Sequence, residues 1–161
     1  MSSAVERLSK YGSNNILEFV NVAGALPTRN FQAGQFAEAE ALFGEQWREE
    51  VWAQSIACWG CPIHCSKLAR RDDYTLDGPD YETVYSLGTT CGISDRWAIV
   101  EANHICDEYG LDTISAGNTI GFVMELFQRG YVGAADLDGV EATWGSTEAM
   151  LALLHKMAVG E

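Results

Sequence analysis

The stretch SDRWAIVEANHICDEYGLDTISAGNTIGFVMELFQRG, residues 94–130, predicts two consecutive helices joined by a short polar turn. In the first helix, Ser94 is a plausible N-cap and Gly110 a C-terminal stop. The second helix begins after Asp112 and ends at Gly130. Because both segments repeat apolar residues at helical spacing, this part of the chain predicts helices that pack on a common core.

The remaining segments predict further helices separated by long ordered loops. A short helix, a break at YGSNN and a second apolar stretch are expected over residues 4–22, and a helical pattern anchored by Trp47 and Trp52 is expected over residues 37–55. The last predicted helix, STEAMLALLHKMAVG, is capped by Ser146 and has Gly160 near its end. It runs almost to the final residue, which suggests a chain that was cut rather than finished.

Two segments lack helical periodicity. GALPTRNFQAGQF (24–36) predicts an ordered loop, and ARRDDYTLDGPDYE (69–82) predicts a polar, turn-rich and partly exposed connection. Strand-like alternation is scarce. The fold class that follows is a mainly α helical domain with long structured loops.

Composition narrows the possible functions. The 161 residues suffice for one ordinary domain, and the 47% of apolar residues can form a real core. A formal charge of −13 argues against nucleic acid and anionic lipid as partners. No apolar run is long enough to span a membrane, and the N-terminal segment lacks the apolar core of a signal peptide. A cytoplasmic protein with reduced thiols is therefore expected.

The segment CWGCPIHC, residues 58–65, carries three of the five cysteines at C-x2-C-x3-C spacing. One compact loop of this kind can supply three ligands of an iron–sulfur cluster. A zinc site that includes His64 and a set of unligated thiols are the alternatives. Cys91 and Cys106 are candidates for a fourth ligand, but buried packing is the favoured interpretation of both, above all of Cys106 within a helix.

Glu101, His104 and Asp107 recur at every third residue and form one polar row on the first helix of residues 94–130. A solvated face is the common explanation of such a row, and an E-x-x-H metal pair is the alternative. Glu82 likewise has two possible interpretations. It is either an exposed glutamate at a helix start or, in an apolar pocket, a group that holds and releases a proton.

Five segments in the same order together resemble the tungsten- or molybdenum-containing aldehyde ferredoxin oxidoreductase family. They are LPTRNFQAGQF, CWGCPIHC, GPDYETVYSLG, EANHICDEYGLDTIS and WGSTEAM. The resemblance implies that Cys58, Cys61 and Cys65 are ligands of a 4Fe–4S cluster. It also implies that the fourth cysteine lies beyond the end of this chain.

The same resemblance implies roles for five further residues or motifs. Asp107, Leu111 and Asp112 match the D-x-x-G-L-D motif that contacts one of two pterins, with Leu111 contributing through its backbone. Glu82 matches a glutamate beside the metal that is proposed to assist proton transfer. Glu101 matches a ligand of a mononuclear iron that bridges two subunits in some homodimeric members, with a histidine partner further down the chain.

On this basis residues 1–161 are expected to be most of the middle helical domain of a longer enzyme. An N-terminal β-rich domain and a C-terminal helical domain would be absent, so this piece alone would be inactive. The expected reaction is oxidation of a small aldehyde to a carboxylic acid by a tungsten (or molybdenum) bis-pterin. Electrons would pass through the cluster to ferredoxin or another redox subunit, in a homodimer or hetero-oligomer.

Two alternatives to this function remain. Within the same family, the chain would belong to a reductase of the benzoyl-CoA type that acts on an aryl-CoA thioester. Outside it, the chain would be a small non-catalytic iron–sulfur or zinc module that carries electrons or mediates an interaction.

Overall fold

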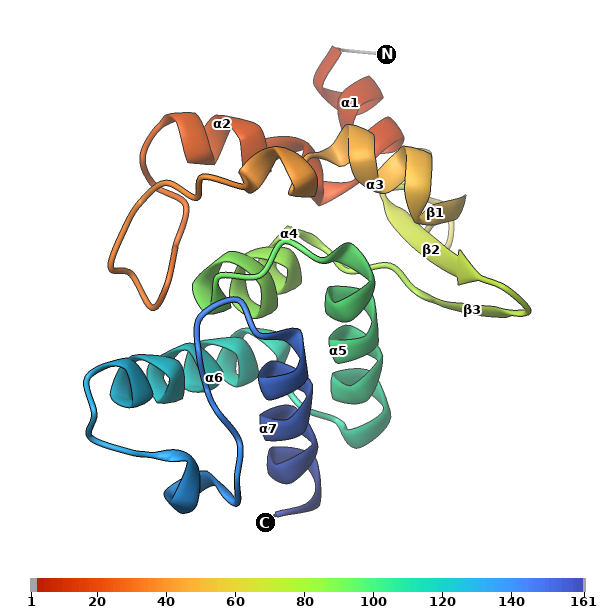
Figure 1. Cartoon of the computed structure of the whole chain (residues 1–161). Helices are drawn as coiled ribbons and strands as arrows, with labels where there is room; N and C mark the ends of the chain where they lie inside the picture. Colours follow the sequence, from red (N-terminus) through yellow and green to blue (C-terminus); the bar gives the residue numbers. More distant parts are fainter. Residues whose placement is uncertain (1–2, 161) are drawn as a thin grey trace.

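The computed structural model describes residues 3–160 and confirms a mainly α fold with one small antiparallel sheet (Figure 1). In chain order the main elements are α1 (Ser3–Tyr11), α2 (Leu17–Val22), α3 (Gly44–Glu50), β1 (Trp52–Ile56), β2 (Ser66–Arg71), β3 (Tyr74–Asp77), α4 (Tyr81–Thr83), α5 (Arg96–Tyr109), α6 (Thr113–Gln128) and α7 (Thr147–Val159). A π-helical turn, Val84–Gly88, and 3-10 turns at 13–16, 39–42, 89–91 and 134–137 complete the set.

The expected helix over residues 37–55 was wrong in its C-terminal part, and residues 69–82 are partly exposed as predicted but contain strands that were not predicted. The helical part ends at Glu50, and β1, β2 and β3 follow as an antiparallel sheet in that order. Alternation is present in β2, but its buried face carries Lys67 and Ala69 instead of large apolar side chains. The inward face of β2 therefore lacks the large apolar or β-branched residues at every second position by which a strand is recognised in a sequence.

The predicted helix ends are mostly confirmed. Asp112 caps α6 by accepting a hydrogen bond from Ser115 N at 2.7 Å, and Ser146 caps α7. Gly110 and Gly160 end α5 and α7 in the left-handed conformation that glycine adopts without strain. The prediction of Ser94 as a cap was wrong by one residue, since Asp95 caps α5.

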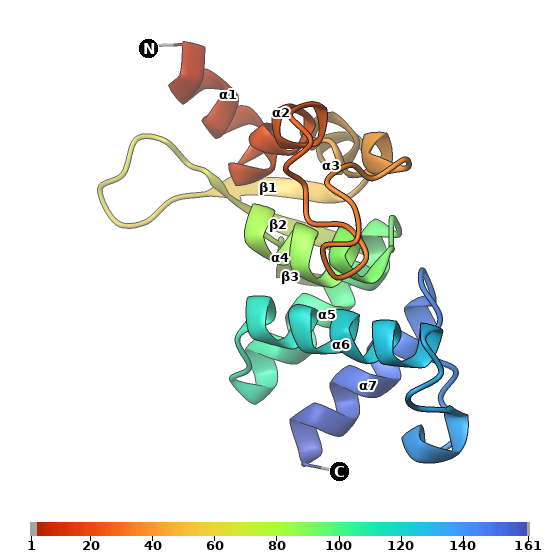
Figure 2. The ribbon, with the colours of Figure 1, turned by 90° about the vertical axis from the view of Figure 1, so that its left-hand side faces the viewer.

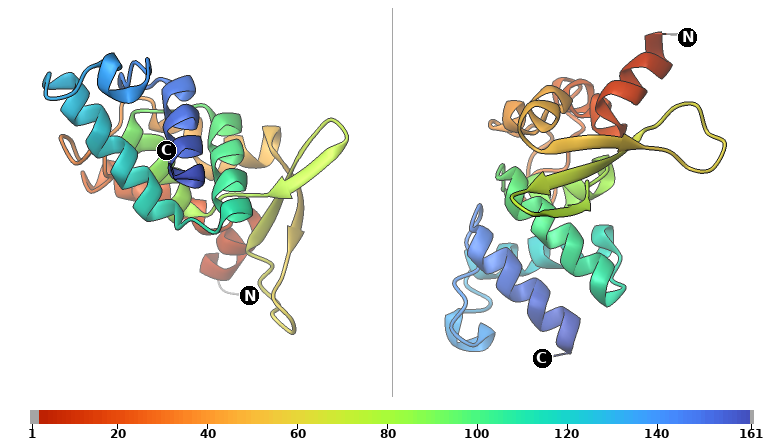
Figure 3. Two further views of the ribbon diagram at one scale, coloured as in Figure 1. Left: turned by 90° about the horizontal axis from the view of Figure 1, so that it is seen from below. Right: turned by 90° about the vertical axis from the view of Figure 1, so that its right-hand side faces the viewer.

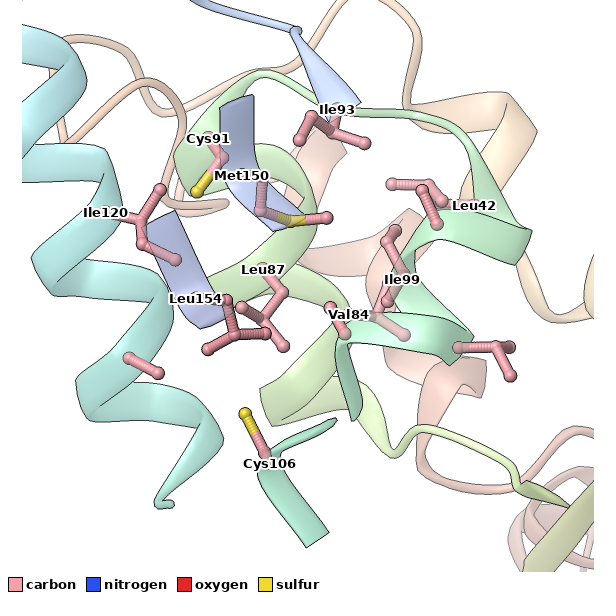
Figure 4. Packing of buried hydrophobic residues seen from close by; sticks show 14 of the residues in the cluster. Leu42, Val84, Leu87, Cys91, Ile93, Ile99, Cys106, Ile120, Met150 and Leu154 are labelled. Carbon is pink, nitrogen blue, oxygen red and sulfur yellow. The ribbon is translucent and has the colours of Figure 1, made fainter. Parts of the chain in front are cut away.

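The core lies where α5, α6 and α7 surround the helical segment 84–91 (Figure 4). The labelled side chains of this cluster are buried, and they come from these four elements and from Leu42 and Ile93 beside them. Helix α6 approaches the 84–91 segment so closely that a Cβ at Gly117 would lie 2.4 Å from the carbonyl oxygen of Ser86. This contact fixes the position of α6, and with it the Asp112 turn, relative to the segment 84–91.

Helices α1 to α3 and the sheet form one layer, and α5 to α7 form the other, with α4 between them (Figures 1 and 2). The connection between β1 and β2, coloured yellow, projects away from both layers (Figures 2 and 3). Within residues 3–160, no helix has the length and apolar character needed to cross a membrane.

Candidate metal and cofactor site

The three clustered cysteines lie on the projecting connection between β1 and β2, which is called the cysteine loop here and comprises residues 57–65. Its first turn is closed by a hydrogen bond from Cys61 N to Cys58 O of 3.0 Å. Gly60 and His64 both have positive φ angles, 73° and 58°, so the backbone is left-handed at each of these residues. Strands β1 and β2 hold the two ends of the loop side by side.

The chemistry of the donor set fits an iron–sulfur cluster, because one short loop offers three free thiols. Cys58 is exposed, and Cys61 and Cys65 are half-buried. Across residues 3–160 no three His, Cys, Asp or Glu side chains converge closely enough to hold a metal ion. The cysteine loop must therefore fold inward for its thiolates to share one centre.

Cys91 and Cys106 lie in the core, as the packing interpretation predicts (Figure 4). The Cys91 thiol donates to Ser86 O at 3.6 Å and to Gly117 O at 3.5 Å. Burial raises the pKa of the Cys91 thiol to about 12, and burial together with the Asp107 carboxylate raises the pKa of Cys106 to about 11. Both thiols stay protonated at neutral pH, which makes them poor metal ligands.

Lys67 is a residue at the root of the cysteine loop that the sequence analysis did not single out. Its side chain is buried on the inner face of β2, with only 5% of its surface exposed. The ammonium nitrogen donates to Ser9 O at 2.7 Å, to Ser55 Oγ at 2.9 Å and to His64 O at 3.0 Å. Burial lowers the pKa of Lys67, and the charge of Cys65 opposes that shift. The signal for this role was a charged residue at an inward strand position.

A cavity of about 320 Å³ connects the root of the cysteine loop to α5. Ile56 and Ser66, which flank the loop, line one side, and Asn103 and Asp107 of α5 line the other. The remaining lining residues are polar or small: Lys67, Asp77, Gly78, Asp80 and Thr83. The residues that flank the cysteine loop and Asp107 of α5 therefore line a single polar cavity.

Asp107 is held in this cavity by the amide of Asn103, which donates to its Oδ2 at 3.0 Å. Burial, followed by the nearby Asp77 carboxylate, raises the pKa of Asp107, whereas His104 and the Asn103 hydrogen bond oppose that change. Within residues 3–160, the hydrogen bond seen at the Asp107 carboxylate is made by Oδ2, and none is seen at Oδ1. Oδ1 is thus available to a donor that enters the cavity.

The turn from Asp107 to Asp112 is the ordered link between α5 and α6. Leu111 N donates to Cys106 O at 2.8 Å, so a backbone contact from Leu111 to a ligand falls to its carbonyl oxygen. Asp112 is exposed, and its hydrogen bond from Ser115 lowers the pKa of its carboxyl group. The turn brings both acidic side chains of the motif to the same end of α5, but only Asp107 lines the cavity.

Glu82 is exposed in the first turn of α4, as the helix-start interpretation predicts. Its neighbours Tyr81 and Tyr85 pack ring against ring with centroids 5.3 Å apart. Burial, followed by nearby charges that include Glu82, raises the pKa of each tyrosine. In residues 3–160 no apolar pocket encloses Glu82.

Glu101, His104 and His155 share a second groove of about 410 Å³, between α5 and α7. Ile105, Glu108 and Tyr109 complete its lining. The E-x-x-H pair is therefore not spread over an unbroken solvated face. The histidine of α7 joins it, and the sequence alone does not reveal this because helix α6 and a long connection separate α5 from α7 along the chain.

Three free thiols lie on a loop whose flanking residues, Ile56 and Ser66, line a polar cavity together with the acidic residue Asp107. A family model described as "Aldehyde ferredoxin oxidoreductase, domains 2 & 3" matches residues 1–161. The chain belongs to this family.

Relatives of named function support the same assignment. The tungsten-containing aldehyde ferredoxin oxidoreductase of Thermococcus kodakarensis is 39% identical over 153 residues, which cover 94% of this chain and 25% of that protein. The enzyme of the same name from Pyrococcus furiosus is 38% identical over 156 residues, 96% of this chain and 26% of that protein. The WOR-like subunit of an aliphatic sulfonate oxidoreductase from Pyrococcus furiosus is 37% identical over 135 residues, 80% of this chain and 21% of that protein.

A solved structure shares the fold. The active site complex of benzoyl coenzyme A reductase with 1,5-dienoyl-CoA superposes with a TM-score of 0.64 at 19% identity, covering 92% of this chain and 23% of that chain. At this identity the likeness concerns the fold alone. The chain spans about a quarter of the length of the curated aldehyde ferredoxin oxidoreductases that it matches.

Proposed function

We propose that residues 1–161 form part of a tungsten- (or molybdenum-) pterin oxidoreductase that oxidises aldehydes to carboxylic acids and passes electrons through a 4Fe–4S cluster to ferredoxin or another redox subunit. One observation carries this proposal. The cavity that is lined by Asp107 is also lined by Ile56 and Ser66, the residues that flank the cysteine loop. A cluster and a pterin held at these two places would be neighbours, as electron transfer between them requires.

The cysteine loop supplies Cys58, Cys61 and Cys65 as the thiolate ligands of the cluster. When bound, the metal pterin supplies the two-electron oxidation, and the cluster supplies one-electron transfer to the acceptor. The protein binds and orients these groups and keeps water away from them. It does so here with the sheet on one side of the cavity and α5 on the other.

Asp107 binds the pterin by accepting a hydrogen bond from a ring N–H through the carboxylate oxygen that Asn103 does not occupy. Leu111 contributes its carbonyl oxygen, and Asp112 contributes the face of its carboxylate that does not cap α6. Glu82 holds and releases a proton beside the metal. Because Glu82 is exposed, this role requires further protein that covers α4 and removes the carboxyl group from water.

We extend the proposal to a mononuclear iron in the groove between α5 and α7. Glu101 offers a carboxylate there, and His155 offers an imidazole from the facing helix. Two ligands from one chain leave positions that a second copy fills across a two-fold axis, which accords with a homodimer. Loss of iron from the His155→Ala variant, with cluster iron retained, would support this site, and unchanged total iron would contradict it.

Cysteine substitution in the native polypeptide that contains residues 1–161 tests the cluster assignment. Cys61→Ser is expected to abolish cluster incorporation, because a serine hydroxyl is a much weaker iron ligand than a thiolate. Cys91→Ser is the matched control, since the Cys91 thiol is buried in the core. Unchanged iron in Cys61→Ser would refute the ligand assignment.

Substrate assays separate the aldehyde oxidase from the benzoyl-CoA type of reductase. Reduction of an acceptor dye by aldehydes supports the first, and turnover of aryl-CoA thioesters alone supports the second. The non-catalytic module predicts instead that the 161-residue chain alone takes up a stable, stoichiometric cluster. Anaerobic reconstitution followed by EPR distinguishes this case, because no cluster signal on the isolated chain would count against it.

A further inference from the structure

Lys67 is a buried cation that forms none of the ion pairs seen within residues 3–160, although the charge of Asp80 acts on it from a distance. Its ammonium group has three hydrogens, and three neutral oxygens accept them: Ser9 O, Ser55 Oγ and His64 O. The ring of Trp52 lies beneath it, with its centroid 5.8 Å from Nζ. The ion pairs found within residues 3–160 involve other basic residues, although the protein has a formal charge of −13.

A buried ammonium group usually requires a nearby negative charge, because removing it from water costs several kcal/mol. Asp80 lines the same cavity, but it is exposed and its Oδ1 accepts a hydrogen bond from Ser13 at 2.7 Å. The ammonium group is instead joined to the cysteine loop, because Nζ donates a hydrogen bond to the carbonyl oxygen of His64, the residue before Cys65.

Metal binding brings negative charge to the cysteine loop. Thiols must lose their protons to become metal ligands, so three cysteines bring three negative charges to the centre that they hold. A fixed positive charge at the root of the loop would offset that charge. Because Lys67 also bonds Ser9 of α1 and Ser55 of β1, the position of this charge is set by the rest of the fold.

We propose that Lys67 is a positioning residue for the cysteine loop, which fixes the loop through His64 O and stabilises the thiolate-bound metal centre by its charge. This inference rests on the proposed metal-binding role of Cys58, Cys61 and Cys65. It adds an element of the site from outside the C-x2-C-x3-C motif. It also assigns a purpose to a lysine at an inward position of a strand.

Cobalt(II) is the probe for the test, because its thiolate complexes absorb in the near ultraviolet and need no fourth cysteine or sulfide. The native polypeptide that contains residues 1–161, reduced, free of oxygen and stripped of metal, is titrated with Co²⁺, and the absorbance gives the dissociation constant. Lys67→Met is expected to weaken Co²⁺ binding about tenfold, on the order of the loss of one hydrogen bond from a charged donor. Lys10→Met is the matched control, because it removes the same charge from an exposed position on α1.

Lys67→Gln serves as a second variant if Lys67→Met unfolds, and circular dichroism establishes which variants are folded. Glutamine keeps a donor for His64 O but lacks the charge, so weaker binding than wild type is expected again. Equal affinity of a folded Lys67 variant and Lys10→Met would overturn the inference while leaving the cysteine ligands in place. A wild-type chain without a thiolate band, like Cys61→Ser, would overturn both the inference and the proposed ligand set.

The reduction potential of the cluster gives an independent readout in the native polypeptide. A nearby cation stabilises the reduced, more negative cluster, so Lys67→Met is expected to shift the midpoint potential to more negative values. Lys10→Met should leave the midpoint where it is in the wild type. An unshifted midpoint in Lys67→Met would contradict the electrostatic part of the proposal.

Discussion

The contact of α6 with the helical segment 84–91 predicts the sign of a Gly117→Ala substitution. A methyl group at this position would lie 2.4 Å from both the carbonyl carbon and oxygen of Ser86, and 2.8 Å from Leu87 N. Ordinary van der Waals contact begins at 3.4 Å, so the two elements must separate by about 1 Å. The obstructing atoms are backbone, and they belong to a segment that Ser86 Oγ ties to Thr113 O at 3.1 Å.

Two effects of this substitution oppose each other. Alanine is favoured over glycine within a helix by about 1 kcal/mol, which would stabilise α6. Overpacking a close interface costs about 1–3 kcal/mol, and here the obstacle is rigid. We expect the steric effect to win because no flexible side chain can move away. The expected net loss in the free energy of unfolding is up to about 2 kcal/mol.

Urea unfolding followed by circular dichroism measures this difference, and Gly133→Ala is the control. A Cβ at Gly133 meets only Asp136 Oδ2, at 3.8 Å, so the control should change the free energy of unfolding by less than about 0.5 kcal/mol. A Gly117→Ala variant more stable than wild type would show that helix propensity decides. The claim that the close contact between α6 and the Ser86 backbone excludes a larger side chain at position 117 would then be refuted.

Three further substitutions test the acidic residues of the site. Glu82→Gln in the native polypeptide should lower turnover by about 10²-fold or more while pterin content is retained, and undiminished turnover would exclude the proton-transfer role. Asp107→Asn should raise the free energy of unfolding at neutral pH, because a raised pKa destabilises the charged form in the folded state. That gain should vanish as the pH falls below the ordinary value of 3.8, and a gain independent of pH would contradict its electrostatic origin. Asp112→Ala should behave oppositely: its pKa is lowered, so the stability it contributes is present above 3.8 and is lost as the pH falls through the folded value. Urea unfolding at several pH values measures both carboxylates, and a destabilisation by Asp112→Ala that persists in acid would rule out the charged cap.

The helices could be predicted from sequence because their signals are local. Caps such as Asp112 and Ser146 and stops such as Gly110 depend only on neighbouring residues. The sheet could not be predicted in this way. Its central strand buries Lys67 and Ala69, and the reasons for that burial are contacts with α1 and β1 that lie far away in the sequence.

The candidate site divides along the same line. The C-x2-C-x3-C spacing identified the cysteine loop, and apolar surroundings correctly placed Cys91 and Cys106 in the core. Local patterns could not predict that Ile56 and Ser66, which flank the loop, line the same cavity as Asp107. This proximity depends on how β1 and β2 pair and pack against α5. The meeting of Glu101 with His155 likewise depends on how α7 packs on α5.

The metal content of the native polypeptide that contains residues 1–161 tests the central claim most directly. Purified without oxygen, it should hold about four iron atoms and four acid-labile sulfides for each cluster, together with tungsten or molybdenum. The Cys61→Ser variant should lose the cluster iron and sulfide, whereas Cys91→Ser should keep them. Zinc in place of iron, with neither tungsten nor molybdenum, would contradict the account, as would full cluster content in Cys61→Ser.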